Sequence, residues 1–60
     1  MTKKEMIIEI VDYNYTTPKQ FEEDMKKAMR LSKEKVEKVY KEFKKDEEHA
    51  SFYKYLLTRY

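Results

Sequence analysis

The sequence predicts an all-α fold, a small bundle of three or four short helices that forms a single domain over residues 1–60. Three observations favour this fold. The chain contains no glycine, which the tight turns of β-hairpins usually require. Apolar residues recur at helical spacing in successive segments. Serine and threonine precede these segments, where they serve as helix N-caps. We expect helices over about residues 3–14, 18–30, 33–45 and 47–59.

The first segment is predicted to be a helix, with a strand as the alternative. Thr2 and Glu5 have the spacing of a capping box, and the apolar residues of MIIEIV follow at helical spacing. The isoleucines and the valine of this segment instead favour a strand over residues 6–13. Such a strand would have to pair with a second chain across a dimer, because no other segment has a strand pattern. We therefore favour the helix.

Two further helix starts are visible in the middle of the chain. Thr17 is the predicted N-cap of the second helix, and Pro18 suits its first position. Ser32 is the predicted N-cap of the third helix, and Leu31 can pack on Val36 as a hydrophobic staple. These signals predict two helices that are joined by a short turn.

The C-terminal stretch SFYKYLLTRY has the pattern of an amphipathic helix. At about 100° per residue, its apolar face points roughly 110° away from the apolar seam of residues 36–43. We therefore expect a break near Asp46, with Asp46 as a new N-cap. His49 falls on the apolar arc of the tail, which predicts a partly buried structural histidine. Tyr55 lies off the edge of that arc, with Arg59 near it.

The composition argues against an enzyme. The chain has 14 basic and 12 acidic residues and a net charge of +2, so its charge is mixed. It has no cysteine and a single histidine, His49, so we expect neither a metal site nor a cofactor. No glycine-rich loop is present to bind phosphate. The carboxylates alternate with lysines as they do in ion pairs on helix surfaces.

No part of the chain has the pattern of a membrane protein or of a secreted one. The longest apolar run is far shorter than the roughly 20 residues that a membrane-spanning helix needs. The lack of cysteine is compatible with a reducing compartment. We expect a cytoplasmic protein that has no membrane partner.

The aromatic content favours protein binding. Six tyrosines and three phenylalanines are more than a core of this size can bury, and tyrosine is well suited to interfaces. We expect a non-catalytic protein that binds another protein and inhibits or regulates it, such as an inhibitor of a host factor encoded by a phage or a mobile element. The candidate protein-binding residues are Tyr13, Tyr15, Tyr53, Tyr55, Leu57, Arg59 and Tyr60.

A homodimer is expected for two reasons. A chain of 60 residues has a small core that often needs a partner chain for stability. The apolar directions of residues 36–43 and of the tail also diverge, so one core would not cover both.

The stretch MKKAMRLSKEKVEKVY resembles a helix-turn-helix, which makes a small DNA-binding regulator the alternative function. The chain departs from that family at Lys26 and Arg30, where the family prefers the small residues that let two helices approach closely. Glu34 and Glu37 would also oppose phosphate. The candidate DNA-binding residues are Lys33, Lys35, Lys38 and Lys41.

Two other resemblances involve the ends of the chain. With a strand in first place, the chain resembles a ribbon-helix-helix dimer, which also implies DNA binding, although its linker DYNYTT is longer than that family's. The tail SFYKYLLTRY resembles the opening helix of the YozE-like bacterial small proteins. That resemblance covers ten residues and implies no function for this chain.

Overall fold

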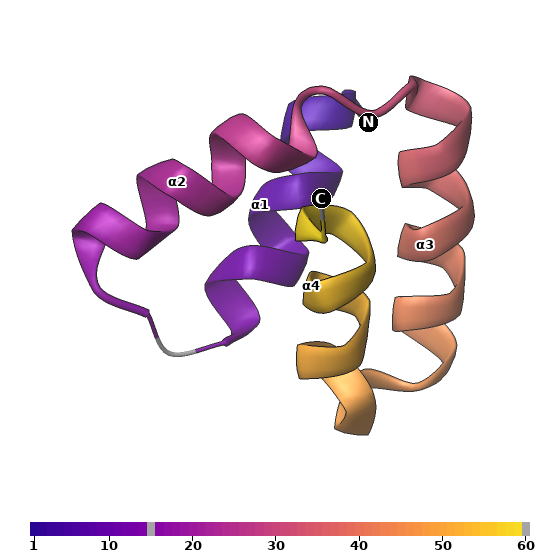
Figure 1. Ribbon diagram of the computed structural model, residues 1–60. Coiled ribbons are helices and arrows are strands. Elements are labelled where there is room, and N and C mark those ends of the chain that lie inside the picture. Colours follow the sequence, from indigo (N-terminus) through magenta and orange to yellow (C-terminus); the bar gives the residue numbers. More distant parts are fainter. Residues whose placement is uncertain (15, 60) are drawn as a thin grey trace.

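A computed structural model of the protein describes residues 1–14 and 16–59. Over these residues the elements are α1 (Lys3–Tyr13), α2 (Pro18–Ala28), α3 (Lys33–Lys45), a short 3₁₀ turn η1 (Glu47–His49) and α4 (Ala50–Thr58) (Figure 1). The prediction of an all-α bundle is confirmed. The described residues contain no strand, so the strand alternative for the first segment is wrong, and the resemblance to a ribbon-helix-helix protein loses its basis.

The first segment forms the central helix of the bundle. α1 packs against α2, α3 and α4 (Figure 1). The Thr2 hydroxyl accepts a hydrogen bond from the Glu5 N–H at 3.2 Å, and the Glu5 carboxylate accepts one from the Thr2 N–H at 3.0 Å. The predicted capping box is therefore present. The buried residues of α1 are Met6, Ile7, Ile10 and Val11. Burial against three neighbouring helices outweighs the strand preference of its β-branched residues.

The predicted caps of α2 and α3 are also present. The Thr17 hydroxyl accepts a hydrogen bond from the Gln20 N–H at 3.2 Å, and the Ser32 hydroxyl accepts one from the Lys35 N–H at 3.3 Å. Lys3 fastens the turn between the two helices to the start of α1. Its Nζ donates hydrogen bonds to the carbonyl oxygens of Met29 at 2.8 Å and Leu31 at 2.9 Å, two acceptors in the turn that follows α2.

The chain turns sharply between α3 and α4, as predicted. Asp46 follows the last residue of α3 and has non-helical backbone angles, with φ −144° and ψ 63°. The turn brings both apolar faces into one core, which includes Val36, Val39, Phe43, Ala50, Tyr53 and Leu57. The two apolar directions thus converge within one chain, and the divergence that favoured a homodimer disappears.

Candidate protein-binding surface

The side of α4 that faces away from the core carries exposed aromatic residues. The relative exposure of Phe52 is 52% and that of Tyr55 is 56%. These residues are three positions apart and lie on the same side of the helix. The guanidinium carbon of Arg59 lies 5.9 Å from the centroid of the Tyr55 ring, within the range of a cation–π contact. We refer to Phe52, Tyr55 and Arg59 as the α4 outer surface.

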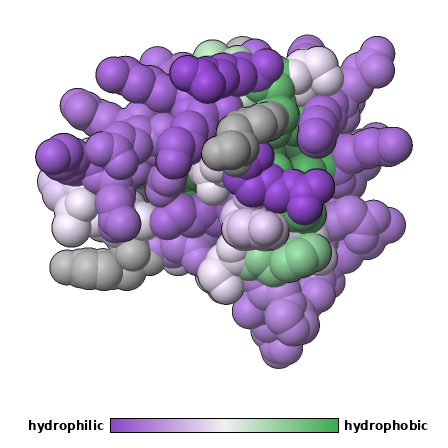
Figure 2. Space-filling view, viewed as in Figure 1, coloured by the Kyte–Doolittle hydropathy of each residue, from purple (hydrophilic) through white to green (hydrophobic). Residues whose placement is uncertain are grey.

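Hydrophobic surface is also visible where α4 meets α3, with hydrophilic side chains on both sides of it (Figure 2). Leu56 is half-buried and packs against the core, one position from Tyr55 along the helix. The α4 outer surface is therefore apolar and aromatic at its centre, with a basic residue at its end. This composition resembles that of the cores of protein interfaces, in which aromatic residues and arginine are enriched.

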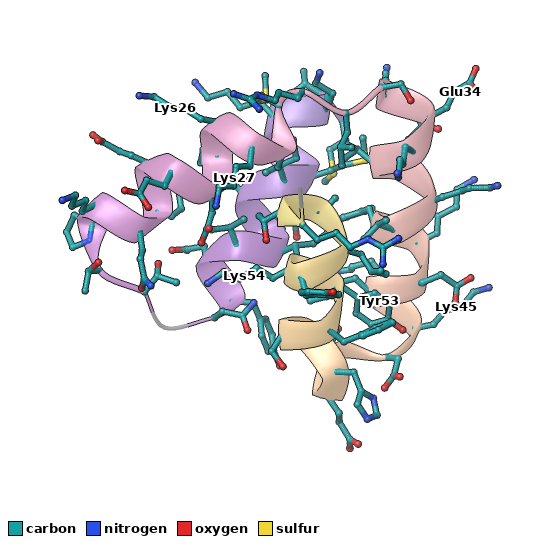
Figure 3. The ribbon with its side chains drawn as sticks, in the orientation of Figure 1. Lys26, Lys27, Glu34, Lys45, Tyr53 and Lys54 are labelled. Carbon is teal, nitrogen blue, oxygen red and sulfur yellow. The ribbon has the colours of Figure 1, made fainter. Side chains whose placement is uncertain are left out.

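The opposite side of α4 belongs to the core. Leu57 is fully buried and Tyr53 is 8% exposed. The Tyr53 ring lies 6.3 Å from the Phe43 ring, edge to face, between α4 and α3 (Figure 3). Burial, together with the nearby negative charge of Asp46, raises the pKa of Tyr53. In the folded chain both candidates therefore belong to the core and offer almost no surface to a partner.

The remaining tyrosine candidates have different positions. Tyr13 is the last residue of α1 and is 57% exposed. Its ring packs edge to face on the Phe43 ring, with 5.5 Å between the ring centroids. One part of the Tyr13 ring therefore contacts the core, and the rest is exposed to solvent. Tyr15 and Tyr60 lie outside the described residues.

A shallow groove runs beside Tyr55. It is lined by Asn14, Ser51, Lys54, Tyr55 and Thr58. The Asn14 Nδ2 donates hydrogen bonds to the Ile10 carbonyl at 2.9 Å and the Ala50 carbonyl at 3.3 Å, which holds the end of α1 to the start of α4. The groove therefore places polar groups next to an exposed aromatic ring. Nothing in the sequence pattern predicted Asn14 at this position, because the contact joins segments that are far apart in the chain.

Lys54 joins one wall of this groove to α2. Its Nζ lies 3.1 Å from the Asp24 Oδ2, and the two side chains are only 21% and 15% exposed. Figure 3 shows Lys54 reaching from α4 toward α2. The contact has the distance of an ion pair but not the geometry of a hydrogen bond, and this carboxylate oxygen has no hydrogen-bond donor. Among the described residues, Lys54 is the cation within ion-pair distance of this oxygen.

The structure corrects the expectation for His49. Its side chain is 65% exposed rather than buried, and its Nδ1 lies 2.7 Å from the Asp46 Oδ2. The hydrogen bond and the charge of Asp46 raise the pKa of His49 above its ordinary value. Asp46 stands before the 3₁₀ turn, but its side chain makes no capping hydrogen bond to the backbone. His49 ends the 3₁₀ turn and has non-helical backbone angles. The angular positions of the α4 residues therefore do not extend back to His49.

The lysines of α3 are all exposed, but they do not form one basic surface. Lys38 and Lys41 lie on the side away from the core, whereas Lys33 and Lys35 diverge by roughly 160° at the start of the helix. A shallow depression on this side is lined by Ser32, Glu34, Lys35, Glu37, Lys38 and Lys41. Carboxylates are thus interspersed with the lysines.

The arrangement of α2 and α3 also differs from a helix-turn-helix. Each packs against α1 and α4, and the two make no substantial contact with each other (Figure 1). The exposed Lys26 and Arg30 replace the small residues that would permit close approach. The stretch therefore forms two capped helices and a turn without the direct packing of that motif.

No family model, curated protein or solved structure matches the chain. Within residues 1–14 and 16–59, no group of three or more histidine, cysteine, aspartate or glutamate residues is placed to hold a metal ion. The helices of these residues are too short and too polar for any of them to cross a membrane.

Proposed function

We propose that this protein is a non-catalytic regulator that acts by binding another protein through the α4 outer surface and the groove beside it. The observation that carries the proposal is the exposed Tyr55 ring with the Arg59 guanidinium 5.9 Å from its centroid. A tyrosine held by a cation contributes a large contact area at a small cost in conformational entropy. Tyrosine and arginine are also the residues that most often dominate the binding energy of interfaces.

The surroundings of Tyr55 support a protein partner rather than a small molecule. The groove is shallow and open, and its lining includes the polar side chains of Asn14, Ser51 and Thr58. Small-molecule sites are usually enclosed and mostly apolar, whereas protein interfaces combine an aromatic centre with a polar rim. We propose inhibition of the bound protein as the mode of regulation, of the kind that phage and mobile-element proteins exert on host factors.

The experiment is affinity capture from a lysate of the source cell, with the tagged protein as bait. We expect one partner in stoichiometric amount, and we expect Tyr55→Ala to abolish its capture because the ring forms the centre of the surface. The control is Lys38→Ala, which truncates an exposed side chain of α3 that lies outside the α4 outer surface. Capture that Tyr55→Ala leaves unchanged would contradict the proposal, provided that circular dichroism shows both variants folded.

DNA binding through α3 is the second proposal, and the exposure of the four candidate lysines, Lys33, Lys35, Lys38 and Lys41, supports it. The carboxylates among those lysines weaken it, because they repel phosphate. A gel-shift assay with duplex DNA at low salt distinguishes the two functions. Affinity that falls steeply with salt and is lost in the triple variant Lys33→Ala/Lys35→Ala/Lys38→Ala would establish DNA binding. If no shift occurs at low salt, this second proposal is wrong.

A further inference from the structure

Basic residues from the start of α1 and the end of α2 lie together at one end of the bundle. The Lys3 Nζ donates hydrogen bonds to two carbonyl oxygens of the turn after α2, at 2.8 and 2.9 Å, so the start of α1 lies beside that turn. Lys4 follows in α1, Lys26 lies in the last turn of α2, and Arg30 lies in the turn after it. Figure 3 shows Lys26 at this edge, with further nitrogen-bearing side chains beside it. We refer to Lys3, Lys4, Lys26 and Arg30 as the basic end.

The exposed cations of the basic end are not engaged in ion pairs with other described residues. Lys4, Lys26 and Arg30 are exposed, and no carboxylate of a described residue lies within ion-pair distance of any of them. Lys44 and Lys54, by contrast, each lie at that distance from a carboxylate. The charges of the basic end therefore remain available to an external anion.

The turns at the two ends of α3 differ in charge. The acidic residues of the turn after α3 are Asp46, Glu47 and Glu48. The turn before α3 lies at the opposite end of the bundle (Figure 1) and carries Arg30. Near the basic end, the Glu5 carboxylate is held by the Thr2 N–H at 3.0 Å, and Glu34 lies on the other side of the molecule from Lys26 (Figure 3). This separation of charge directs the basic end toward polyanions.

We propose that the basic end binds the phosphate backbone of duplex DNA without reading its sequence. Phosphates recur at short, regular intervals along both strands, so several cations on neighbouring segments can each neutralise one of them. The inference goes beyond the binding of a protein at α4, because it uses a different surface. It shares duplex DNA with the second proposed function, but it moves the contact from the lysines of α3, which have carboxylates among them, to the basic end.

The surroundings of the basic end favour a duplex over other polyanions. Single strands bind through aromatic rings on which their bases stack. The exposed aromatic rings of the described residues, Tyr13, Phe52 and Tyr55, lie at the far end of α1 and on α4. Anionic membranes are bound through a large apolar face next to the cations. The apolar side chain between Lys26 and Arg30 that is exposed is Met29, and its exposure is only 40%.

The test is fluorescence anisotropy of a short labelled DNA duplex, titrated with the full chain from low to physiological salt. We expect log affinity to fall with log salt at a slope of about −3, since Lys4, Lys26 and Arg30 each neutralise one phosphate. Lys26→Ala/Arg30→Ala should bring the slope to about −1 and weaken binding at low salt by at least about tenfold. A second duplex of unrelated sequence should bind equally well.

Two double variants provide the controls. Lys19→Ala/Lys45→Ala removes the same charge from exposed residues at the far ends of α2 and α3, and it should bind like the unaltered protein. Lys26→Arg/Arg30→Lys keeps the charge of the basic end and should bind within about twofold of the unaltered protein. The inference is wrong if the unaltered protein does not bind at low salt, or if Lys26→Ala/Arg30→Ala binds as tightly as the first control.

A further pair of variants separates this inference from DNA binding through α3. Lys35→Ala/Lys38→Ala removes two lysines of α3 and leaves the basic end intact. If this variant loses binding while Lys26→Ala/Arg30→Ala retains it, the inference fails and the contact lies on α3. If only Lys26→Ala/Arg30→Ala loses binding, the inference holds and the second proposed function fails.

Discussion

The outer sides of α3 and α4 face solvent in the same bundle but differ in composition. α3 exposes lysines with glutamates among them, whereas α4 exposes Phe52, Tyr55 and Arg59. The charged side of α3 is stable in water without a partner, because interspersed ion pairs on a helix surface are well solvated. The two exposed rings of α4 gain free energy when they are covered. The comparison therefore supports the proposal that the interaction surface lies on α4.

The largest expected loss of stability comes from a substitution on the inner side of α4, and the same substitution on its outer side is the control. Leu57→Asp buries a carboxylate among apolar residues, and we expect it to cost about 4 kcal/mol or more. A domain of this size has only about 3–9 kcal/mol of stability, so thermal denaturation should find the variant largely unfolded. Phe52→Asp is the control on the outer side, where the same new charge meets water. If Leu57→Asp and Phe52→Asp had the same midpoint of thermal denaturation, the assignment of the two sides would be wrong.

A smaller loss of stability is expected when the ion pair between Asp24 and Lys54, beside the groove at Tyr55, is broken. Asp24→Asn leaves the Lys54 ammonium without its counter-ion while the side chain is only 21% exposed. We expect destabilisation of about 2 kcal/mol, between the values for exposed and fully buried pairs. Urea denaturation measures it. The double variant Asp24→Asn/Lys54→Met should recover part of the loss, because no unpaired charge is left; a purely additive result would show that the pair is not coupled.

On α3, a change of charge is expected to have little effect on stability. Lys38→Glu and Lys41→Glu alter exposed residues that face away from the core, so each should change the free energy of unfolding by less than about 0.5 kcal/mol. The same variants should leave partner capture intact. Loss of capture on either substitution would extend the binding surface to α3 and remove the contrast between the two helices.

The smallest expected effect on stability is a pH dependence that arises in the turn between α3 and α4. Asp46 raises the pKa of His49, so protonated His49 stabilises the folded state. This contribution is fully present below the unfolded pKa of about 6.5 and is lost as the pH rises through the raised folded value. In Asp46→Asn, NMR titration should show the pKa of His49 returning toward its ordinary value. An unchanged titration would mean that the 2.7 Å contact does not persist in solution.

Much of the fold follows from local signals in the sequence. Thr2, Thr17 and Ser32 are the N-caps of the three longer helices. They could be predicted because an N-cap hydrogen bond involves only residues a few positions apart. The break near Asp46 followed from the mismatch between two apolar directions, which a single straight helix cannot satisfy.

The details of the surface did not follow from local signals. Phe52 and Tyr53 are adjacent aromatic residues, and at about 100° per residue a helical wheel puts both on the apolar face of the tail. Only Tyr53 is buried, because its ring packs on Phe43 and the turn at Asp46 sets the rotation of α4. The helical wheel also put His49 on the apolar face, but the structure shows its side chain exposed. A helical wheel gives angles within one helix, whereas the rotation of that helix against its neighbours depends on tertiary packing.

The most direct test of the central contrast is quantitative capture with three baits: the unaltered protein, Tyr55→Ala and Lys38→Ala. All three should give the same helical circular dichroism, since both substituted residues are exposed. We predict that the unaltered protein and Lys38→Ala retain the same partner in equal amount and that Tyr55→Ala retains none. Capture that survives in Tyr55→Ala but disappears in Lys38→Ala would contradict the account and place the interaction surface on α3.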